Sequence, residues 1–599
     1  MACTDSKVSG PLSAFVGSLG FPQFLFERIS IRRDGPLSHT AAHAFVLYVS
    51  TVALRAEENP ALDVAVHLSR ALNVPVVAHG FFDDRSAHAT ARRAHFIIDS
   101  AREAQACLTA KGIPCTYQIM KNGARQPMHL TLASRAVCVV TDEAFVEPYL
   151  TLFGQLKRMK TPFVSVDTSC IYPARLTRAK DCDRAFRFRN ATSAARRKRI
   201  STPYPPPPSV RPHHSLNSKT VIELLKSLPK GLLYLANDTC VSTTDLLENT
   251  QIDVTVPPVT NTKGGTGNGI RRWNTFLAKG LSSYASRRNN PLHHHNQGVS
   301  RMSAYLNLGV VSPFRVGREA MARADGKGKS SVNKWLDEYC TWRELAYSFC
   351  YHVPNHLDVK TAIPTWAFAS LEKHRNDTRK TLSLETLAKA KSGLPLWDIA
   401  QESLIRNGEL HNNLRMTWGK EVLTWTRGAE EAYEYLKYLN DHFALDGLSP
   451  PSYAGLLWCL GWADGPKQER PVFGKVRFRS ARAISRRYNL IKLRDAIRSV
   501  ESPLTRIFQM GVTAPPVTEV TAPPVTGVTA PPVTGDEEKR IPEMFISNSK
   551  GLAGQKRKSD GAKDLNNLDA KRTKKDEKPL DDVEFDGDKF RGELSLPAC

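Results

Sequence analysis

The sequence predicts an N-terminal α/β domain built on a parallel, Rossmann-like sheet, then an all-helical domain and a disordered C-terminal tail. Short apolar runs alternate with helical patterns over residues 41–175, and helical periodicity alone continues over residues 261–505. In the tail, residues 506–599, the octad V-T-A-P-P-V-T-[EG] occurs three times from Val512 to Gly535. The total of 599 residues is too long for one ordinary domain, so several parts are expected.

The α/β domain is predicted from five apolar runs that are separated by helical patterns. The runs are Phe45–Val49, Pro75–Phe82, Pro114–Ile119, Ala136–Asp142 and Pro162–Asp167. Strands of a parallel sheet are buried on both faces and therefore read as continuous apolar runs. No G-x-G-x-x-G opens the first helix, so the dinucleotide fingerprint is absent.

The segments outside the two domains differ from them in composition. Residues 1–40 carry few acidic groups and are expected to form a disordered leader, with an organelle transit peptide as the alternative. Residues 176–260 contain A-A-R-R-K-R and Y-P-P-P-P and are expected to form a basic, proline-rich linker. In the tail, a proline pair in every octad prevents a packed helix or sheet, which predicts a flexible spacer.

Charge and cysteine content narrow the function classes. The net charge of +24 favours a polyanionic partner such as nucleic acid, although basic tails and solvated helix faces could also account for it. No uncharged apolar run reaches about 18 residues, so a membrane span is not expected. The 11 cysteines include no C-x-x-C and no zinc or iron–sulfur spacing, which fits reduced thiols.

Five motifs in the second half of the chain carry the most specific signal. They are W-L-D-E-Y-C-T-W-R-E-L at 335–345, P-L-W-D at 395–398, H-N-N-L-R-M at 411–416, L-D-G at 445–447 and R-P-V-F-G-K-V-R at 470–477. Their order and spacing resemble the flavin-binding half of the photolyase/cryptochrome family, most closely the class II cyclobutane-dimer photolyases. The resemblance implies an α/β antenna domain, a helical domain with non-covalent FAD, and a possible second antenna chromophore of the folate or deazaflavin type, whose site no residue identifies.

The resemblance also implies which residues bind FAD. The residues expected at the diphosphate are Tyr284, Ser300, Arg301, Met302 and Ser303, and those expected at the flavin ring are Asn412, Arg415 and Asp446. Hydroxyls and amides at a helix start can cradle phosphate, and a cation beside the ring stabilises reduced flavin. The neighbouring triplet His293–His295 lacks a further ligand at metal spacing, so a solvated loop and no metal site are expected.

Repair chemistry is assigned by resemblance to Glu338 and Trp342. Trp335, Glu338 and Trp342 have i, i+3 and i+7 spacing, which predicts one helix face. In the family, the matching glutamate hydrogen-bonds a flipped pyrimidine dimer and the tryptophan packs against it. If protonated, the glutamic acid would stabilise charge that develops on a thymine carbonyl.

Four tryptophans are candidates for relaying electrons to the flavin, with ordinary core packing as the alternative for each. They are Trp397, Trp418, Trp425 and Trp458.

The leading hypothesis is a blue-light-driven photolyase acting on cyclobutane pyrimidine dimers in damaged DNA, which are flipped out of the duplex. Two departures from class II favour a cryptochrome-type photoreceptor that signals to partners through its tail. Pro451 or Ser452 stands where class II enzymes place an asparagine near flavin N5, and Lys467 stands where they carry a second dimer-packing tryptophan. A light-independent DNA-binding protein with vestigial flavin is the third alternative.

The tail also contains two basic clusters, K-R-K at Lys556–Lys558 and K-R-T-K-K at Lys571–Lys575. Their separation resembles a bipartite nuclear import signal, which predicts an import receptor as partner and nuclear localisation. Generic tail charge is the alternative explanation. An organelle or the cytoplasm is the alternative location.

Overall fold

The structure is a computed structural model that describes residues 10–37, 45–215, 217–229, 232–235, 241–326 and 328–500. The predicted tail, residues 506–599, with its octad repeat and basic clusters, lies outside the described residues. Within the described part, no helix is both long and apolar enough to cross a membrane.

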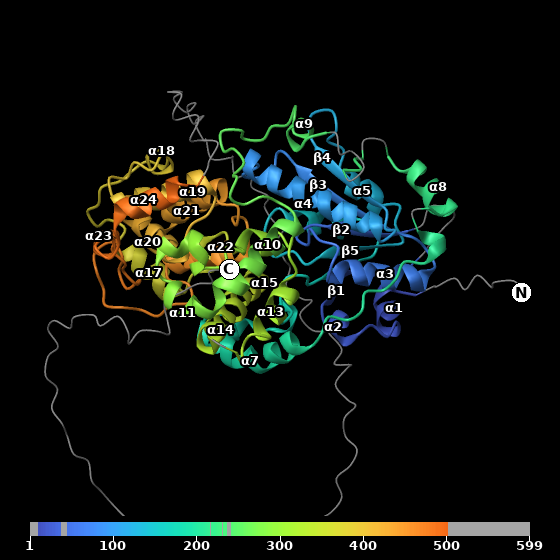
Figure 1. Ribbon diagram of the computed structural model, residues 1–599, viewed down its shortest axis with the longest axis horizontal. Helices are drawn as coiled ribbons and strands as arrows, with labels where there is room; N and C mark the ends of the chain where they lie inside the picture. Colours follow the sequence, from blue (N-terminus) through green and yellow to red (C-terminus); the bar gives the residue numbers. More distant parts are fainter. Residues whose placement is uncertain are drawn as a thin grey trace, which may run out of the picture. The chain divides into compact units, whose positions relative to one another are not determined.

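The N-terminal domain contains a six-stranded sheet with the strand order β1-β6-β5-β2-β3-β4 (Figure 1). The strands are β1 (Ile29–Arg33), β2 (Val46–Ser50), β3 (Val76–Asp83), β4 (Cys115–Met120), β5 (Cys138–Asp142) and β6 (Phe163–Val166). The pairs β6–β5, β5–β2, β2–β3 and β3–β4 are parallel, and β1 pairs antiparallel with β6 at the edge. The five predicted strands and the parallel sheet are confirmed.

Helices pack on both faces of this sheet because alternate strand residues point to opposite sides. In β2, Val46 and Tyr48 face one hydrophobic cluster, while Leu47 and Val49 face the other. The helices of this region are α1 (Leu12–Ser18), α2 (Gln23–Phe26), α3 (Pro60–Leu72), α4 (Ala91–Ala110), α5 (Met128–Ala133) and α6 (Tyr149–Arg158). Helix α3 covers the first face, and α5 and α6 cover the second.

Two expectations about the flanking segments are corrected. The described part of the expected leader, residues 10–37, is ordered, since it supplies α1, α2 and the edge strand β1. The expected linker contains α7 (Ala185–Ser201), α8 (Lys219–Ser227) and α9 (Thr243–Leu246). Helix α8 packs on the sheet through Leu224, because its amphipathic pattern gives it an apolar side.

The all-helical prediction for the second domain is confirmed: between residues 261 and 500, the described residues form helices and no strand (Figure 1). The helices are α10 (Thr266–Lys279), α11 (Tyr284–Arg287), α12 (Ser303–Asn307), α13 (Pro313–Met321), α14 (Lys329–Asp337), α15 (Glu344–His352), α16 (Val359–Ala362), α17 (Thr365–Lys373), α18 (Leu384–Ala388), α19 (Pro395–Asn407), α20 (Asn412–Val422), α21 (Ala429–Phe443), α22 (Pro450–Cys459), α23 (Ala481–Ser485) and α24 (Leu490–Arg498).

A buried arginine of the α/β domain ties it to the helical domain. Arg92 of α4 is 3% exposed and donates hydrogen bonds to the carbonyls of Leu404 and Ile405 at 2.8 and 2.6 Å. The Leu404 carbonyl also accepts from the Gly408 N–H at 3.0 Å, so the guanidinium adds donors at the end of α19, where backbone carbonyls run short of intrahelical partners.

A π-helix, η8 (Glu338–Arg343), separates α14 from α15 and corrects the predicted helix face. Because a π-helix bonds residue i to i+5, the α-helical i, i+3, i+7 register fails across it. Trp335 stacks on Tyr339 with ring centroids 4.8 Å apart and belongs to one hydrophobic cluster. Trp342 belongs to a different cluster, so the two indoles do not flank Glu338 in the predicted way.

Candidate functional site

A cleft in the helical domain lies among α12, α20, α22 and the loops that precede α12 and α20. It encloses about 740 Å³ of empty space, part of it open to solvent. Its lining residues are His294, Val299, Arg301, Ser303, Asn307, Glu409, Leu410, Asn412, Arg415, Met416, Asp446, Pro451, Ser452 and Gly455.

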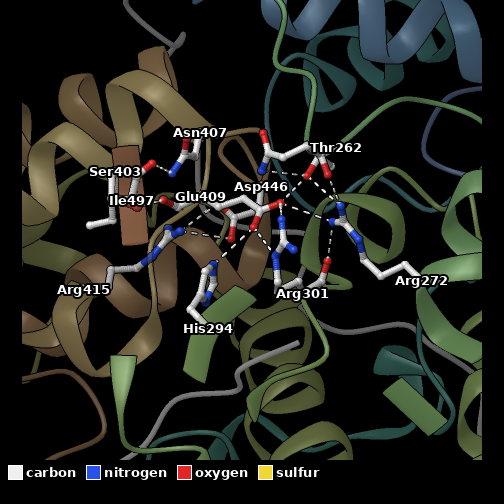
Figure 2. A network of polar contacts seen from close by, with 11 residues as sticks. Thr262, Arg272, His294, Arg301, Ser403, Asn407, Glu409, Arg415, Asp446 and Ile497 are labelled. Atoms are coloured by element: carbon white, nitrogen blue, oxygen red, sulfur yellow. Dashed lines mark hydrogen bonds and ion pairs between the residues drawn. The ribbon is translucent and has the colours of Figure 1, made fainter. Parts of the chain in front are cut away.

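One end of the cleft carries an arginine–aspartate pair. Arg415 projects from α20, which begins at Asn412 after His411 accepts a hydrogen bond from the Asn413 amide. Its Nη2 donates to the two Asp446 oxygens at 2.9 and 3.1 Å (Figure 2). Its Nη1 donates to Asn440 Oδ1 at 2.6 Å. The guanidinium is therefore held rigidly, with its charge balanced by a single carboxylate.

The other end of the cleft is a cluster around Glu409 (Figure 2). Arg301 donates to its two carboxylate oxygens at 2.6 and 3.1 Å, Arg272 donates at 3.2 Å, and His294 Nε2 lies at 3.2 Å. Thr262 also donates to it. Burial raises the pKa of Glu409, but attraction to Arg301 and Arg272 outweighs it, so the pKa lies well below its usual range.

The histidine triplet beside this cluster is more buried than predicted. His294 is 9% exposed, and the expectation of a solvated loop is corrected at this residue because its ring bonds Glu409. Ligand atoms of His294, His295 and Glu409 lie within 4.8 Å of one another. A cation there would face the guanidiniums of Arg301 and Arg272 at close range, and that repulsion disfavours metal binding.

Five of the eight residues predicted to bind FAD line the cleft: Arg301, Ser303, Asn412, Arg415 and Asp446. The other three, Tyr284, Ser300 and Met302, are buried outside its lining, at 0, 2 and 0% exposure. Both candidates for the N5 position, Pro451 and Ser452, face the cleft.

Sequence reasoning missed Glu409, Arg272 and Asn307. Glu409 and Arg272 are 137 positions apart in the chain, and no motif joins them. The one feature of the sequence that could have indicated Glu409 is its position two residues before the H-N-N-L-R-M motif.

Glu338 lies outside the lining of the cleft and is 1% exposed. Arg288 Nη2 is 2.9 Å and Lys334 Nζ is 2.7 Å from its Oε1. Two cations at hydrogen-bond distance favour the charged carboxylate, whereas the role at a thymine carbonyl that the resemblance implies needs the protonated acid. Trp342 is 5% exposed and packs in the larger hydrophobic cluster.

Three of the four candidate relay tryptophans form a chain of ring contacts with Trp397 in the middle. Trp397 stacks on Trp418 with centroids 6.1 Å apart at 12°, and Trp397 meets Trp425 edge-on at 5.2 Å. Trp458 contacts a different group, since Lys420 Nζ lies 4.5 Å from its ring centroid. Lys467 is partly exposed, 3.7 Å from Asp464.

Comparison with known proteins gives full-length and partial relatives, although no family model matches the chain. A deoxyribodipyrimidine photo-lyase of Methanothermobacter thermautotrophicus is 26% identical over 460 residues, which cover 76% of this chain and 95% of the relative. Enzymes of the same name from Arabidopsis thaliana and Potorous tridactylus are 36% and 35% identical over 38% and 41% of this chain. These matches span less than half of the plant and marsupial proteins, 45% and 46%. The chain belongs to the photolyase/cryptochrome family.

Solved structures agree with this family in fold. A class III photolyase of Agrobacterium tumefaciens matches 80% of this chain and 93% of its own with a TM-score of 0.54 at 16% identity. A cryptochrome of Synechocystis matches 80% of this chain and 95% of its own with a TM-score of 0.55 at 15% identity. At these identities, the likeness concerns the fold alone.

The donor set in the cleft of this photolyase/cryptochrome protein fits FAD. Arg301 lines the cleft, and it shares Glu409 with Arg272, which does not line the cleft. The two guanidiniums carry two positive charges against the one negative charge of Glu409, which leaves an excess of positive charge for a diphosphate. Arg415 and Asp446 offer a donor and an acceptor at the other end, as a flavin ring edge requires. The residues present can therefore hold both the phosphates and the ring.

Proposed function

We propose that this protein is an FAD-dependent, blue-light-driven DNA photolyase that repairs cyclobutane pyrimidine dimers. The observation that carries the proposal is the cleft with the Arg415–Asp446 pair at one end and Arg301 at the other. The relatives named deoxyribodipyrimidine photo-lyase support the lesion class. FAD, when bound in its reduced form, supplies the electron that splits the cyclobutane ring.

In this proposal each end of the cleft has a separate task. Arg301 and the Ser303 hydroxyl at the start of α12 hold the diphosphate, and Arg272 adds positive charge beside them through the shared Glu409. Arg415 stabilises negative charge on the reduced ring, and Asp446 fixes the orientation of the Arg415 guanidinium. The second antenna chromophore implied by the resemblance remains a proposal without an assigned site.

The lesion half of the proposal rests on Glu338 with Arg288 and Lys334. In this arrangement the carboxylate is already paired, so a flipped dimer must take over one of its ion-pair partners or bind beside them. The two cations are suited to backbone phosphates next to the lesion, and DNA affinity should then fall steeply with salt. Damage preference should persist because base flipping supplies it.

A repair assay on the full chain tests the proposal. The protein, loaded with FAD and reduced, is illuminated with an oligonucleotide that contains one thymine dimer, and restored thymines are measured by chromatography against a dark control. Glu338→Gln should lower repair while the flavin absorption is unchanged. The matched control is Glu402→Gln, which removes another glutamate–arginine pair, with Arg498, on the surface. Full repair by Glu338→Gln would remove this residue from the mechanism.

A cryptochrome-type photoreceptor is the second candidate, favoured by three observations: the paired state of Glu338, Pro451 in the cleft, and Lys467 near the R-P-V-F-G motif. Under this alternative, the flavin is photoreduced normally and no thymines are restored. Light then changes binding to signalling partners through the tail. The same assay separates the two candidates, because flavin photoreduction and repair are recorded in one sample.

We also propose nuclear localisation through the basic clusters at Lys556–Lys558 and Lys571–Lys575. Paired clusters of this spacing suit an import receptor, and DNA as substrate requires access to a genome. An organelle or the cytoplasm is the alternative destination.

A further inference from the structure

The segment at residues 202–211, between α7 and the turn at Pro212–His214, is extended and carries the sequence T-P-Y-P-P-P-P-S-V-R. Its two ends have backbone angles close to those of a polyproline II helix, about −75° and 145°: φ −82° and ψ 128° at Thr202, and φ −68° and ψ 139° at Arg211. Proline fixes φ near about −65°, and the residue before a proline is confined to extended conformations. Four consecutive prolines therefore favour a polyproline II helix along the whole segment.

The segment is anchored to α3 at both ends as it runs from α7 toward α8 (Figure 1). The Tyr204 hydroxyl donates to Asp63 Oδ2 at 2.6 Å. Arg70 Nη1 donates to the Ser209 carbonyl at 3.2 Å and to its hydroxyl at 3.1 Å. These contacts hold the segment in place before any partner arrives, so little conformational entropy is left to lose when one binds.

Exposure along the segment follows the period of a polyproline II helix. Such a helix has about three residues per turn, so residues three apart lie on one face. Pro203 and Pro206 are exposed. Pro205 and Pro208 are half-buried, and Pro207 is exposed on the third face. The first pair therefore forms a ridge that points to solvent, here called the outer ridge, and the second pair forms the side turned toward the protein.

The polar groups around the outer ridge suit a partner with aromatic donors and an acidic rim. In the described part of the chain, no donor bonds the carbonyls of residues 205–207. Tryptophan and tyrosine side chains that line a groove can donate to such carbonyls through their N–H and O–H groups. Arg197 and Lys198, near the end of α7, are exposed and favour acidic residues beside that groove.

We propose that residues 202–208 are a docking site for a protein domain that binds polyproline II ligands in an aromatic-lined groove, as SH3 and WW domains do. The outer ridge has the P-x-x-P spacing that such grooves recognise. The ridge enters the groove, and Tyr204 stays on Asp63 as the residue that faces away from the partner. None of these residues lines the cleft, so the inference does not rest on the proposed function.

Isothermal titration of the full chain with purified SH3 and WW domains tests the proposal. The domains are chosen to cover both groups, and at least one should bind saturably. Pro203→Ala combined with Pro206→Ala should weaken that binding at least about tenfold, because it removes both prolines of the outer ridge. The matched control combines Pro205→Ala with Pro208→Ala. It removes the same number of prolines from the side turned toward the protein and should leave the dissociation constant within about threefold.

Urea unfolding of the two double variants separates binding from folding. Each variant loses two prolines, so both should unfold at the same urea concentration, and a difference in binding then reflects the outer ridge itself. If either double variant does not fold, the single variants Pro206→Ala and Pro205→Ala replace the pair.

Three results would overturn the proposal. Equal weakening by both double variants would show that the outer ridge is not what the partner reads. Binding to a peptide of residues 200–211 but not to the full chain would show that α3 holds the segment where partners cannot reach it. Failure of every domain to bind either the peptide or the full chain would leave the segment as a rigid connector between α7 and α8.

Discussion

Asp446→Asn is the most direct test of the cleft, because it removes one charge and keeps the shape. The carboxylate accepts two hydrogen bonds from Arg415, and the side chains of Arg415 and Asp446 are 10% and 18% exposed. Two charges about 4 Å apart attract by about 4 kcal/mol at an effective dielectric constant of about 20, which is an upper bound. Since the asparagine keeps a neutral acceptor and Asn440 still accepts from Arg415, we expect a stability loss of about 2 kcal/mol.

Asp446→Asn should also weaken FAD binding, by more than the lower stability of the folded protein accounts for. A guanidinium without its carboxylate loses orientation toward the flavin ring, and one charge-assisted hydrogen bond contributes about 1.5–3 kcal/mol. We therefore expect an FAD dissociation constant about 10- to 100-fold higher, measured by flavin fluorescence quenching at several protein concentrations.

The matched control is Asp464→Asn. Asp464 pairs with Arg477 through bonds of 2.7 and 3.1 Å, similar to the Arg415–Asp446 pair, and it does not line the cleft. Asp464→Asn should lower the free energy of unfolding in urea by a similar amount and leave the FAD dissociation constant unchanged. If both variants weaken FAD binding equally, or if neither does, the assignment of the ring end of the cleft to Arg415 and Asp446 is refuted.

Three further predictions concern other buried charges and the tail. Glu409→Gln should lower the free energy of unfolding in urea at pH 7 by about 3 kcal/mol, because it leaves Arg301 and Arg272 without a counter-charge. Glu409 stabilises the fold above the ordinary carboxylate pKa, and this stabilisation is lost as the pH falls toward the lower pKa of Glu409 in the folded protein. The difference between wild type and variant should therefore shrink in acid. Burial raises the pKa of Glu344 to about 7, so between about pH 4.5 and pH 7 the glutamate is ionised in the unfolded chain and still protonated in the folded one. Over this range the free energy of unfolding of the wild type should fall with rising pH by up to about 3 kcal/mol more than that of Glu344→Gln. The same pH dependence in both proteins would contradict this prediction. Deleting the chain from Asp536 should abolish nuclear accumulation of a fluorescent fusion, and an unchanged distribution would exclude import through the tail clusters.

The sheet could be predicted because each parallel strand is a continuous apolar run, and the five runs coincide with β2 to β6 within about two residues. The edge strand β1 could not, because its I-S-I-R-R is short and half exposed, and its pairing partner β6 lies far along the chain. Helix α7 was missed for another reason. Its buried stripe has a spacing of four residues, but two of its four members, Thr192 and Arg196, are polar, so hydropathy does not reveal the period.

Site residues that belong to a sequence motif could be predicted. Site residues whose partners lie far away along the chain could not. Arg415 and Asp446 were found from H-N-N-L-R-M and L-D-G, and they do form a pair. Glu409 was not found, because its partner Arg301 is 108 positions away and only the fold brings them together. The π-helix was missed as well, since an i→i+5 turn has no distinct apolar pattern.

The flavin half and the lesion half of the proposed function depend on different elements, so they can fail separately. The FAD residues stand on α12, on α20 and on the loops before α12 and α22, whereas Glu338 stands on the π-helix and is tied to Arg288 and Lys334. Asp446→Asn should therefore lower photoreduction and repair together, through one loss of FAD. Glu338→Gln should lower repair alone, since its ion pairs do not involve the cleft. A protein in which Glu338→Gln changes neither property, while Asp446→Asn still abolishes photoreduction, would use its flavin for light sensing and not for repair.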